Sequence, residues 1–166
     1  MKLFYTAIIL FVALLLSACG GGGGGSVSPP PLYSAVTLKL ITAGTPSKSL
    51  RGVGVKITLP DGVTPQLNVD NSVDTSKIKV SGVAGDGISL TDYTAAASPA
   101  KGTLLISLSS TTPEGFGAGE FAIVTLNIDA GSIPGPVDFA LSELDPIDFG
   151  LNHATGLTVS YTAEFR

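Results

Sequence analysis

The sequence is poor in the residues that most catalytic and metal sites need. It holds one cysteine, one histidine and no tryptophan, and only 13% of its residues are charged. A single cysteine excludes an intramolecular disulfide, and one histidine beside it is too little for an ordinary zinc site. The net charge of −4 argues against the basic surface that nucleic acid phosphates require. We therefore expect no nucleic acid partner, and a fold that depends on its apolar core.

Long apolar runs are also scarce, and the sequence has only one, over residues 3–16. Its 14 residues fall short of the roughly 20 that span a bilayer, and the basic start and small residues after it are typical of a signal peptide. Leu16-Ser17-Ala18-Cys19 resembles the lipobox of bacterial lipoproteins. The resemblance implies cleavage before Cys19, a diacylglyceryl group on its thiol, and an acyl group such as palmitate on the new amine. We predict that residues 1–18 are a lipoprotein signal peptide.

A low-complexity segment follows the lipobox. Six glycines, Gly20–Gly25, precede three prolines, Pro29–Pro31, and we interpret residues 19–32 as a tether that, if flexible, reaches about 20 Å. The expected location is the cell envelope, with the protein anchored to a bacterial membrane and its domain in the periplasm or outside the cell. Gly20 stands where some lipoproteins carry the aspartate that retains them in the inner membrane, so the outer membrane is favoured for a Gram-negative source.

Residues 33–166 show a period of two in their apolar positions, which is typical of half-buried antiparallel strands. The clearest case is Leu157–Phe165, and Phe121–Ile128 is nearly apolar throughout, as in a central strand. We predict an all-β domain, an antiparallel β-sandwich or jelly roll of eight or nine strands, immunoglobulin-like in outline, with a barrel as the alternative. The other predicted strands are 36–40, 53–59, 78–82, 88–91, 104–108 and 137–141. Residues 91–98 are predicted to form one helical turn, and 142–148 an acidic loop.

The stretch Gly119-Glu120-Phe121-Ala122-Ile123-Val124 resembles cohesin modules, which carry a similar glycine and Glu-Phe-Ala-Thr-Ile run before a long strand. The order of strands around it is also similar, over about residues 33–166. Cohesins are nine-stranded jelly-roll sandwiches related to carbohydrate-binding modules, and they bind calcium-loaded dockerin modules. The resemblance implies a non-catalytic interaction domain with a dockerin-like partner. No dockerin-contacting residue can be matched to a position of this sequence.

Candidate chemistry is sparse. His153 lies in a predicted loop, and no serine stands in a Gly-x-Ser-x-Gly elbow, so we expect that the protein is not an enzyme. Glu143, Asp145 and Asp148 form the densest acidic patch and supply the oxygen ligands that calcium prefers. Their spacing lacks the pattern of an EF-hand, and we interpret the patch as a solvated loop. The prediction is therefore no metal and no cofactor except the covalent lipid on Cys19.

Aromatic residues are the remaining candidates for ligand binding. Phe121, Phe139, Tyr161 and Phe165 fall on apolar faces and are predicted to lie in the core, whereas Tyr93, Phe116 and Phe149 are predicted to lie in loops and to be available for contacts. The sequence thus favours a lipid-anchored protein that presents a protein-binding domain. Two alternatives stay open: a polysaccharide-binding module, and a structural subunit of an envelope assembly.

Overall fold

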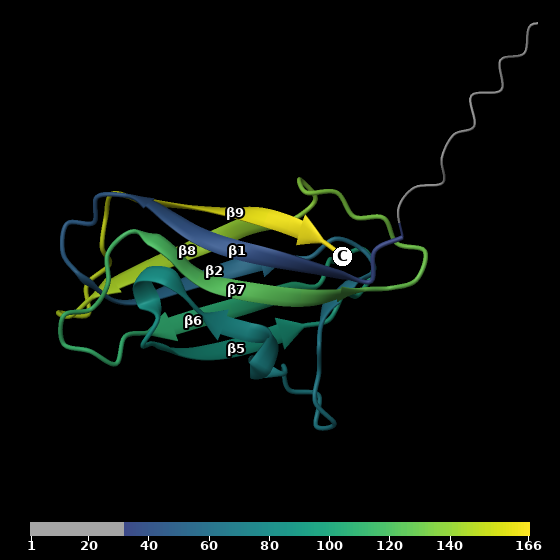
Figure 1. Ribbon diagram of the computed structural model, residues 1–166, viewed down its shortest axis with the longest axis horizontal. Coiled ribbons are helices and arrows are strands. Elements are labelled where there is room, and N and C mark those ends of the chain that lie inside the picture. Colours follow the sequence, from purple (N-terminus) through teal and green to yellow (C-terminus); the bar gives the residue numbers. More distant parts are fainter. Residues whose placement is uncertain (1–31) are drawn as a thin grey trace, which may run out of the picture. The chain divides into compact units, whose positions relative to one another are not determined.

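The computed structural model describes residues 32–166, so the predicted signal peptide, Cys19 and most of the tether lie outside the described residues. Nine strands dominate this part of the chain, together with two short 3-10 turns, η2 (Thr75–Lys77) and η3 (Gly82–Ala84). Figure 1 shows the strands arranged in two layers. Within residues 32–166, no helix is long and apolar enough to cross a membrane.

The first layer, which we call sheet A, is built around two long neighbouring strands, β1 (Ala35–Gly44) and β7 (Gly119–Ile128). β9 (Leu157–Phe165) pairs with the other side of β1, and all of these pairs are antiparallel. The free side of β7 is shared by two short strands, β3 (Val63–Pro65) near its end and β4 (Ile78–Val80) near its middle. The nearly apolar sequence of β7 thus places it centrally, as the sequence predicts.

The second layer, sheet B, has four antiparallel strands in the order β5-β6-β2-β8. Their bounds are β5 (Ile88–Thr94), β6 (Thr103–Ser109), β2 (Leu50–Thr58) and β8 (Ala140–Asp148). β2 changes register against β8 between Leu50 and Gly52 and again between Gly54 and Lys56. Such irregularities bend a strand and increase its local twist.

The core lies between the two sheets and is formed by the inward half of each alternating pattern. Its largest fully buried side chain is Phe121 of β7. Buried aliphatic residues of β1 and β7 face those of β2 and β6, and a half-buried row from β9 packs against them. Burial of apolar surface stabilises a fold by about 25 cal/mol per Å². It is the main stabilising contribution here, because a chain with one cysteine forms no intramolecular disulfide. The predicted antiparallel β-sandwich is confirmed.

Three local predictions are wrong. Residues 91–98 do not form a helical turn: β5 continues to Thr94, and Ala97 then bridges to Ala100. The strand predicted at 137–141 begins only at Ala140, because the Pro134-Gly135-Pro136 segment occupies a hydrogen-bonded loop. The acidic segment 142–148, predicted as a loop, is most of β8. The three-residue strand β3 was not predicted.

Candidate functional site

The outward face of sheet B combines small residues at its centre with large apolar residues at its margins. Strand pairing aligns Ile88, Ser109, Gly52 and Ile147 in one row across the sheet. The next row aligns Leu90, Ser107, Gly54 and Asp145. Directly paired residues point to the same side of a sheet. The first row therefore runs from Ile88 over two small residues to Ile147, and the second from Leu90 over two small residues to the carboxylate of Asp145.

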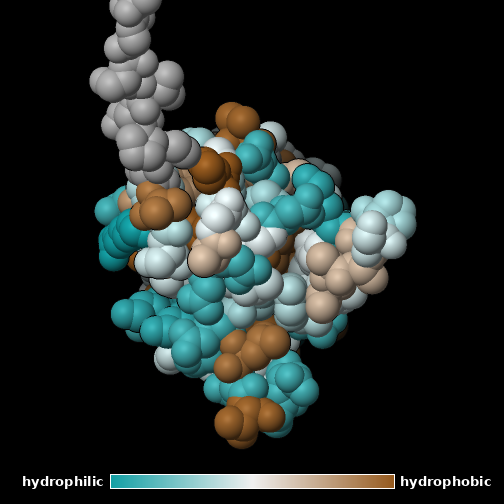
Figure 2. Space-filling view, turned by 90° about the vertical axis from the view of Figure 1, so that its right-hand side faces the viewer, coloured by the Kyte–Doolittle hydropathy of each residue, from teal (hydrophilic) through white to brown (hydrophobic). Residues whose placement is uncertain are grey.

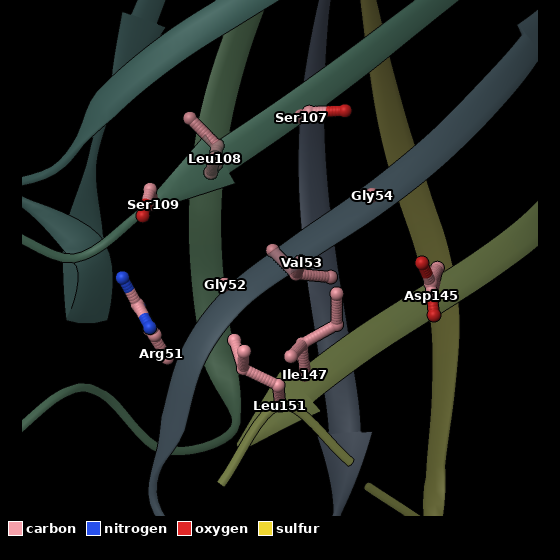
Figure 3. A pocket seen from close by; sticks show the side chains of 10 residues that line it. All are labelled: Arg51, Gly52, Val53, Gly54, Ser107, Leu108, Ser109, Asp145, Ile147 and Leu151. Carbon is pink, nitrogen blue, oxygen red and sulfur yellow. The ribbon is translucent and has the colours of Figure 1, made fainter. Parts of the chain in front are cut away.

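The small residues leave a shallow hollow of about 250 Å³ on this face. Figure 3 shows Gly52 and Gly54 on β2 in the middle of the hollow, with Ser107 and Ser109 on β6 to one side and Asp145 and Ile147 on β8 to the other. A side chain at position 52 would meet the carbonyl oxygen of Leu108 at 2.8 Å, but one at position 54 would have ordinary contacts with Asp145. Backbone and small side chains therefore form the floor of the hollow.

Exposed aliphatic side chains lie on two sides of the hollow, which Arg51 and Asp145 also line. Ile88 and Leu90 are 59% and 72% exposed on one rim, although both lie in a strand. Leu151, 71% exposed, stands beside Ile147 on the other rim. Single exposed aliphatic residues are ordinary, but an arrangement on both sides of a hollow is typical of a contact surface. We call this surface, from Ile88 and Leu90 across the hollow to Leu151, the sheet B groove.

The turn that carries Leu151 is held by Asp148. This carboxylate accepts hydrogen bonds from the backbone N–H groups of Gly150 at 2.8 Å and Asn152 at 2.9 Å, and it lies 3.3 Å from the ammonium group of Lys48. The backbone hydrogen bond from Asn152, together with Lys48, holds the pKa of Asp148 below its ordinary value. The rim residue is thus presented by a fixed turn, in which Leu151 has a positive φ of 62°.

The other acidic residues of β8 have separate partners. Glu143 accepts a hydrogen bond from Lys56 at 2.6 Å, and Asp145 lies 2.9 Å from Nδ1 of His153. Glu143, Asp145 and Asp148 therefore contact three different side chains, Lys56, His153 and Lys48, rather than converging on one point. Within residues 32–166, no group of three or more acidic, histidine or cysteine side chains is arranged to hold a metal ion. The side chain of His153 is mostly exposed and contacts Asp145, and its backbone bridges to Ile147.

The three aromatic candidates are not gathered at one site. Phe116 is only 6% exposed and belongs to the core, so it adds nothing to a contact surface. Tyr93 lies in β5 rather than in a loop and packs half-buried against the core, where burial and then the charge of Asp129 raise its pKa. Only Phe149 is both outside a strand and exposed, next to the backbone of Gly115.

A second, more polar hollow of about 440 Å³ lies on the free side of β5. Leu90, Asp92 and Tyr93 line it from the strand, so Leu90 lies between the two hollows. Asn68, Asn71 and Ser72 line it from the facing loop. Asn68 donates to Ser72 at 3.0 Å, and the hydroxyl and backbone N–H of Ser72 both donate to Asp70, which lowers the pKa of Asp70. This arrangement offers amide, hydroxyl and carboxylate groups on a preformed loop.

The sheet B groove could be found only in part from the sequence. Glycines at alternate positions of a strand, Gly52 and Gly54, are a visible signal, because glycine in a strand marks a close approach or a missing side chain. Their alignment with the serines of β6 and the position of Leu151 depend on register and on a distant turn. Comparison with protein-family models, with curated protein sequences and with solved structures gave no match.

Proposed function

We propose that this chain is a non-catalytic, lipid-anchored envelope protein whose β-sandwich binds a protein partner through the sheet B groove. The observation that carries the proposal is the groove itself, with a glycine and serine floor between two rims of exposed aliphatic side chains. The floor of the hollow is two strands wide, with the strands about 4.8 Å apart. Because the hollow is shallow and open to solvent, it suits a partner's apolar side chains better than a small ligand.

Two features of the sequence support the remaining parts of the proposal. The lipobox Leu16–Cys19 supports an acylated cysteine and attachment to a membrane, which two or more acyl chains make stable. The cohesin-like stretch Gly119–Val124 supports a dockerin-like partner, and its residues form the first part of the central strand β7. A dockerin-like partner carries calcium in its own loops, so the binding is expected to depend on calcium.

The experiment is affinity capture with the detergent-solubilised full-length protein. An extract of the source organism is applied with calcium, and a chelator elutes the bound material for identification. Leu90→Asp places a charge on one rim, and we expect it to weaken capture about 30-fold, the loss typical of a central contact residue at about 2 kcal/mol. The matched control is Thr162→Asp on the exposed outer face of sheet A, which is expected to leave capture unchanged.

A chelator-eluted protein with duplicated calcium loops, lost with Leu90→Asp and retained with Thr162→Asp, supports the proposal. Equal capture by both variants contradicts the assignment to sheet B. Membrane attachment is tested separately with Cys19→Ser, which is expected to abolish acylation. If that variant stays bound to membranes as firmly as the unchanged protein, the anchor proposal is wrong.

The polar hollow beside β5 supports a second candidate function, binding of a polysaccharide. Amide and carboxylate groups such as those of Asn71 and Asp92 suit sugar hydroxyls, and the half-buried ring of Tyr93 gives an optical signal nearby. A bound polysaccharide is expected to change tyrosine fluorescence, and Asn71→Ala and Asp92→Ala are expected to remove that change. A structural subunit of an envelope assembly is distinguished from both by stoichiometric co-purification or self-association.

A further inference from the structure

A second apolar surface lies at the end of the sandwich where the described chain begins. Leu32 is 80% exposed, and Ile133 and Val137 in the loop between β7 and β8 are 54% and 87% exposed. Figure 2 views the molecule toward this end and shows hydrophobic side chains standing out among hydrophilic ones. We call Leu32, Ile133 and Val137 the tether-end patch.

The loop that carries two of these residues has a fixed conformation. The backbone N–H of Asp129 donates to Gly62 at 2.8 Å, and that of Gly135 donates to the carboxylate of Asp138 at 2.6 Å. The hydroxyl of Tyr161 donates to the carbonyl of Pro136 at 2.7 Å, and Phe139 fixes the end of the loop in the core. These hydrogen bonds hold the backbone that flanks Ile133 and Val137 in a conformation that leaves both aliphatic side chains exposed.

The patch is close to the point where the tether joins the domain. Leu32 lines a mainly apolar hollow with Ile128, Ala130 and Gly131, and the N–H of Ser34 donates to the carbonyl of Arg166 at 2.8 Å. Only 13 positions separate Cys19 from Leu32. Fully extended, they span about 45 Å, and as a flexible chain about 20 Å. Acylation at Cys19 would thus keep the patch at high effective concentration beside the lipid surface.

The charges around the patch indicate what kind of lipid surface it suits. Asp61, Asp138 and Lys101 line the hollow next to Ile133, and Asp129 begins the same loop. This acidic excess is repelled by an anionic surface, whereas the aliphatic side chains gain free energy in any interfacial region. From the patch, its fixed loop and the short tether, we infer that the tether-end patch rests on the zwitterionic surface of the bilayer that holds the acyl chains.

This inference rests on the proposed lipid anchor and adds an orientation to it. The patch would hold the domain with its tether end toward the bilayer. Asp148 at the end of β8 pairs with Leu50 at the start of β2, at the end of the sandwich opposite the tether. Leu151, three residues after Asp148, would therefore lie away from the lipid. The sheet B groove would stay accessible to a partner while the domain is in contact with the membrane.

The test uses the acylated full-length protein in phosphatidylcholine vesicles that contain a lipid-attached quencher. Val137→Cys gives a single free thiol for an environment-sensitive fluorophore, because the thiol of Cys19 is acylated. The matched control is Leu151→Cys, an exposed aliphatic position at the far end. We expect the label at position 137 to be blue-shifted and strongly quenched by the lipid, and the label at position 151 to remain unquenched. Adding Ile133→Asp is expected to reduce quenching at position 137 to the level at position 151.

The possible outcomes separate the orientation from the anchor. Equal quenching at both positions in vesicles that carry the protein overturns the inference and leaves the anchor intact. A blue shift at position 137 without lipid quenching also overturns it, and indicates contact with a second copy instead. If the protein does not float with the vesicles at all, both the anchor and the orientation are wrong. Quenching at position 137 that falls when anionic lipid is added supports the zwitterionic surface.

Discussion

The two sheets of the sandwich have equivalent inner faces and different outer faces. Each contributes an alternating row of buried aliphatic residues to one core. Outside, sheet A presents the half-buried Ile123 among mainly hydroxyl, amide and charged side chains: Lys39, Thr125, Asn127, Thr158, Ser160, Thr162 and Glu164. Among the strands of residues 32–166, the only exposed large hydrophobic residues are Ile88 and Leu90, both in sheet B. Folding explains the inner faces of both sheets, but the exposed Ile88 and Leu90 on the outer face of sheet B need another explanation.

The largest expected effects come from the inner faces, where the two sheets should behave alike. Phe121→Ala in β7 and Ile57→Ala in β2 each remove a fully buried side chain, so we expect losses of about 3–5 and 2–5 kcal/mol in the free energy of unfolding. Urea unfolding measures both. As controls, Thr162→Ala and Leu90→Ala on the two outer faces should stay within about 0.5 kcal/mol of the unchanged protein. A loss below 1 kcal/mol at only one core position would break the equivalence of the inner faces.

The alternating inner pattern is also the part of the fold that the sequence predicts well. The period of two placed β1, β2 and β9 close to their observed positions because one face of each is buried, and the apolar runs at 104–108 and 121–128 placed β6 and β7. Most of β8, beyond its first two residues, was missed because its outward positions carry acidic residues and its inward ones include Pro146. Its carboxylates are compatible with a strand because Lys56 and His153 pair with two of them from neighbouring segments. Such partners, distant in sequence, cannot be seen in a local pattern.

The candidate site was less predictable than the fold for a related reason. Exposed aromatic residues were the expected contacts, yet Phe116 is buried and Tyr93 faces the core from β5. The aliphatic residues Ile88 and Leu90 resembled ordinary strand residues, because a sequence does not tell which face of an edge strand is covered. Only the pairing of β5 with β6 shows that they point outward beside Ser107 and Ser109.

Intermediate effects on the free energy of unfolding are expected at two glycines, Gly115 and Gly54, whose surroundings differ. Gly115 has a φ of 66°, and a side chain there would collide with the carbonyl of Leu50 and the ring of Phe149. Gly115→Ala should therefore lower the free energy of unfolding by more than about 1 kcal/mol. Gly54→Ala, whose added methyl would lie 3.6 Å from the side chain of Asp145, should leave stability unchanged or raise it by about 0.4–1 kcal/mol.

This pair of variants separates a glycine that the fold needs from one that the sheet B groove needs. Gly54→Ala narrows the hollow, so it should weaken partner capture while the urea midpoint is unchanged or higher. Gly115→Ala should weaken capture only as far as it unfolds the protein. If Gly54→Ala destabilises the protein as strongly as Gly115→Ala, the hollow is a requirement of the fold, and the contrast between the two outer faces loses its functional meaning.

The smallest effect is expected at the turn that carries Leu151 on the rim of the groove. The backbone hydrogen bonds and Lys48 lower the pKa of Asp148 in the folded protein. The stability that its charge contributes is therefore fully present above the unfolded pKa of about 3.9. It is lost as the pH falls through the lower pKa of the folded protein. Asp148→Asn removes the charge at every pH. The urea midpoints of the variant and the unchanged protein should therefore differ at neutral pH and converge in acid. A difference that stays constant down to about pH 2 would mean that the charge of Asp148 does not hold this rim of sheet B.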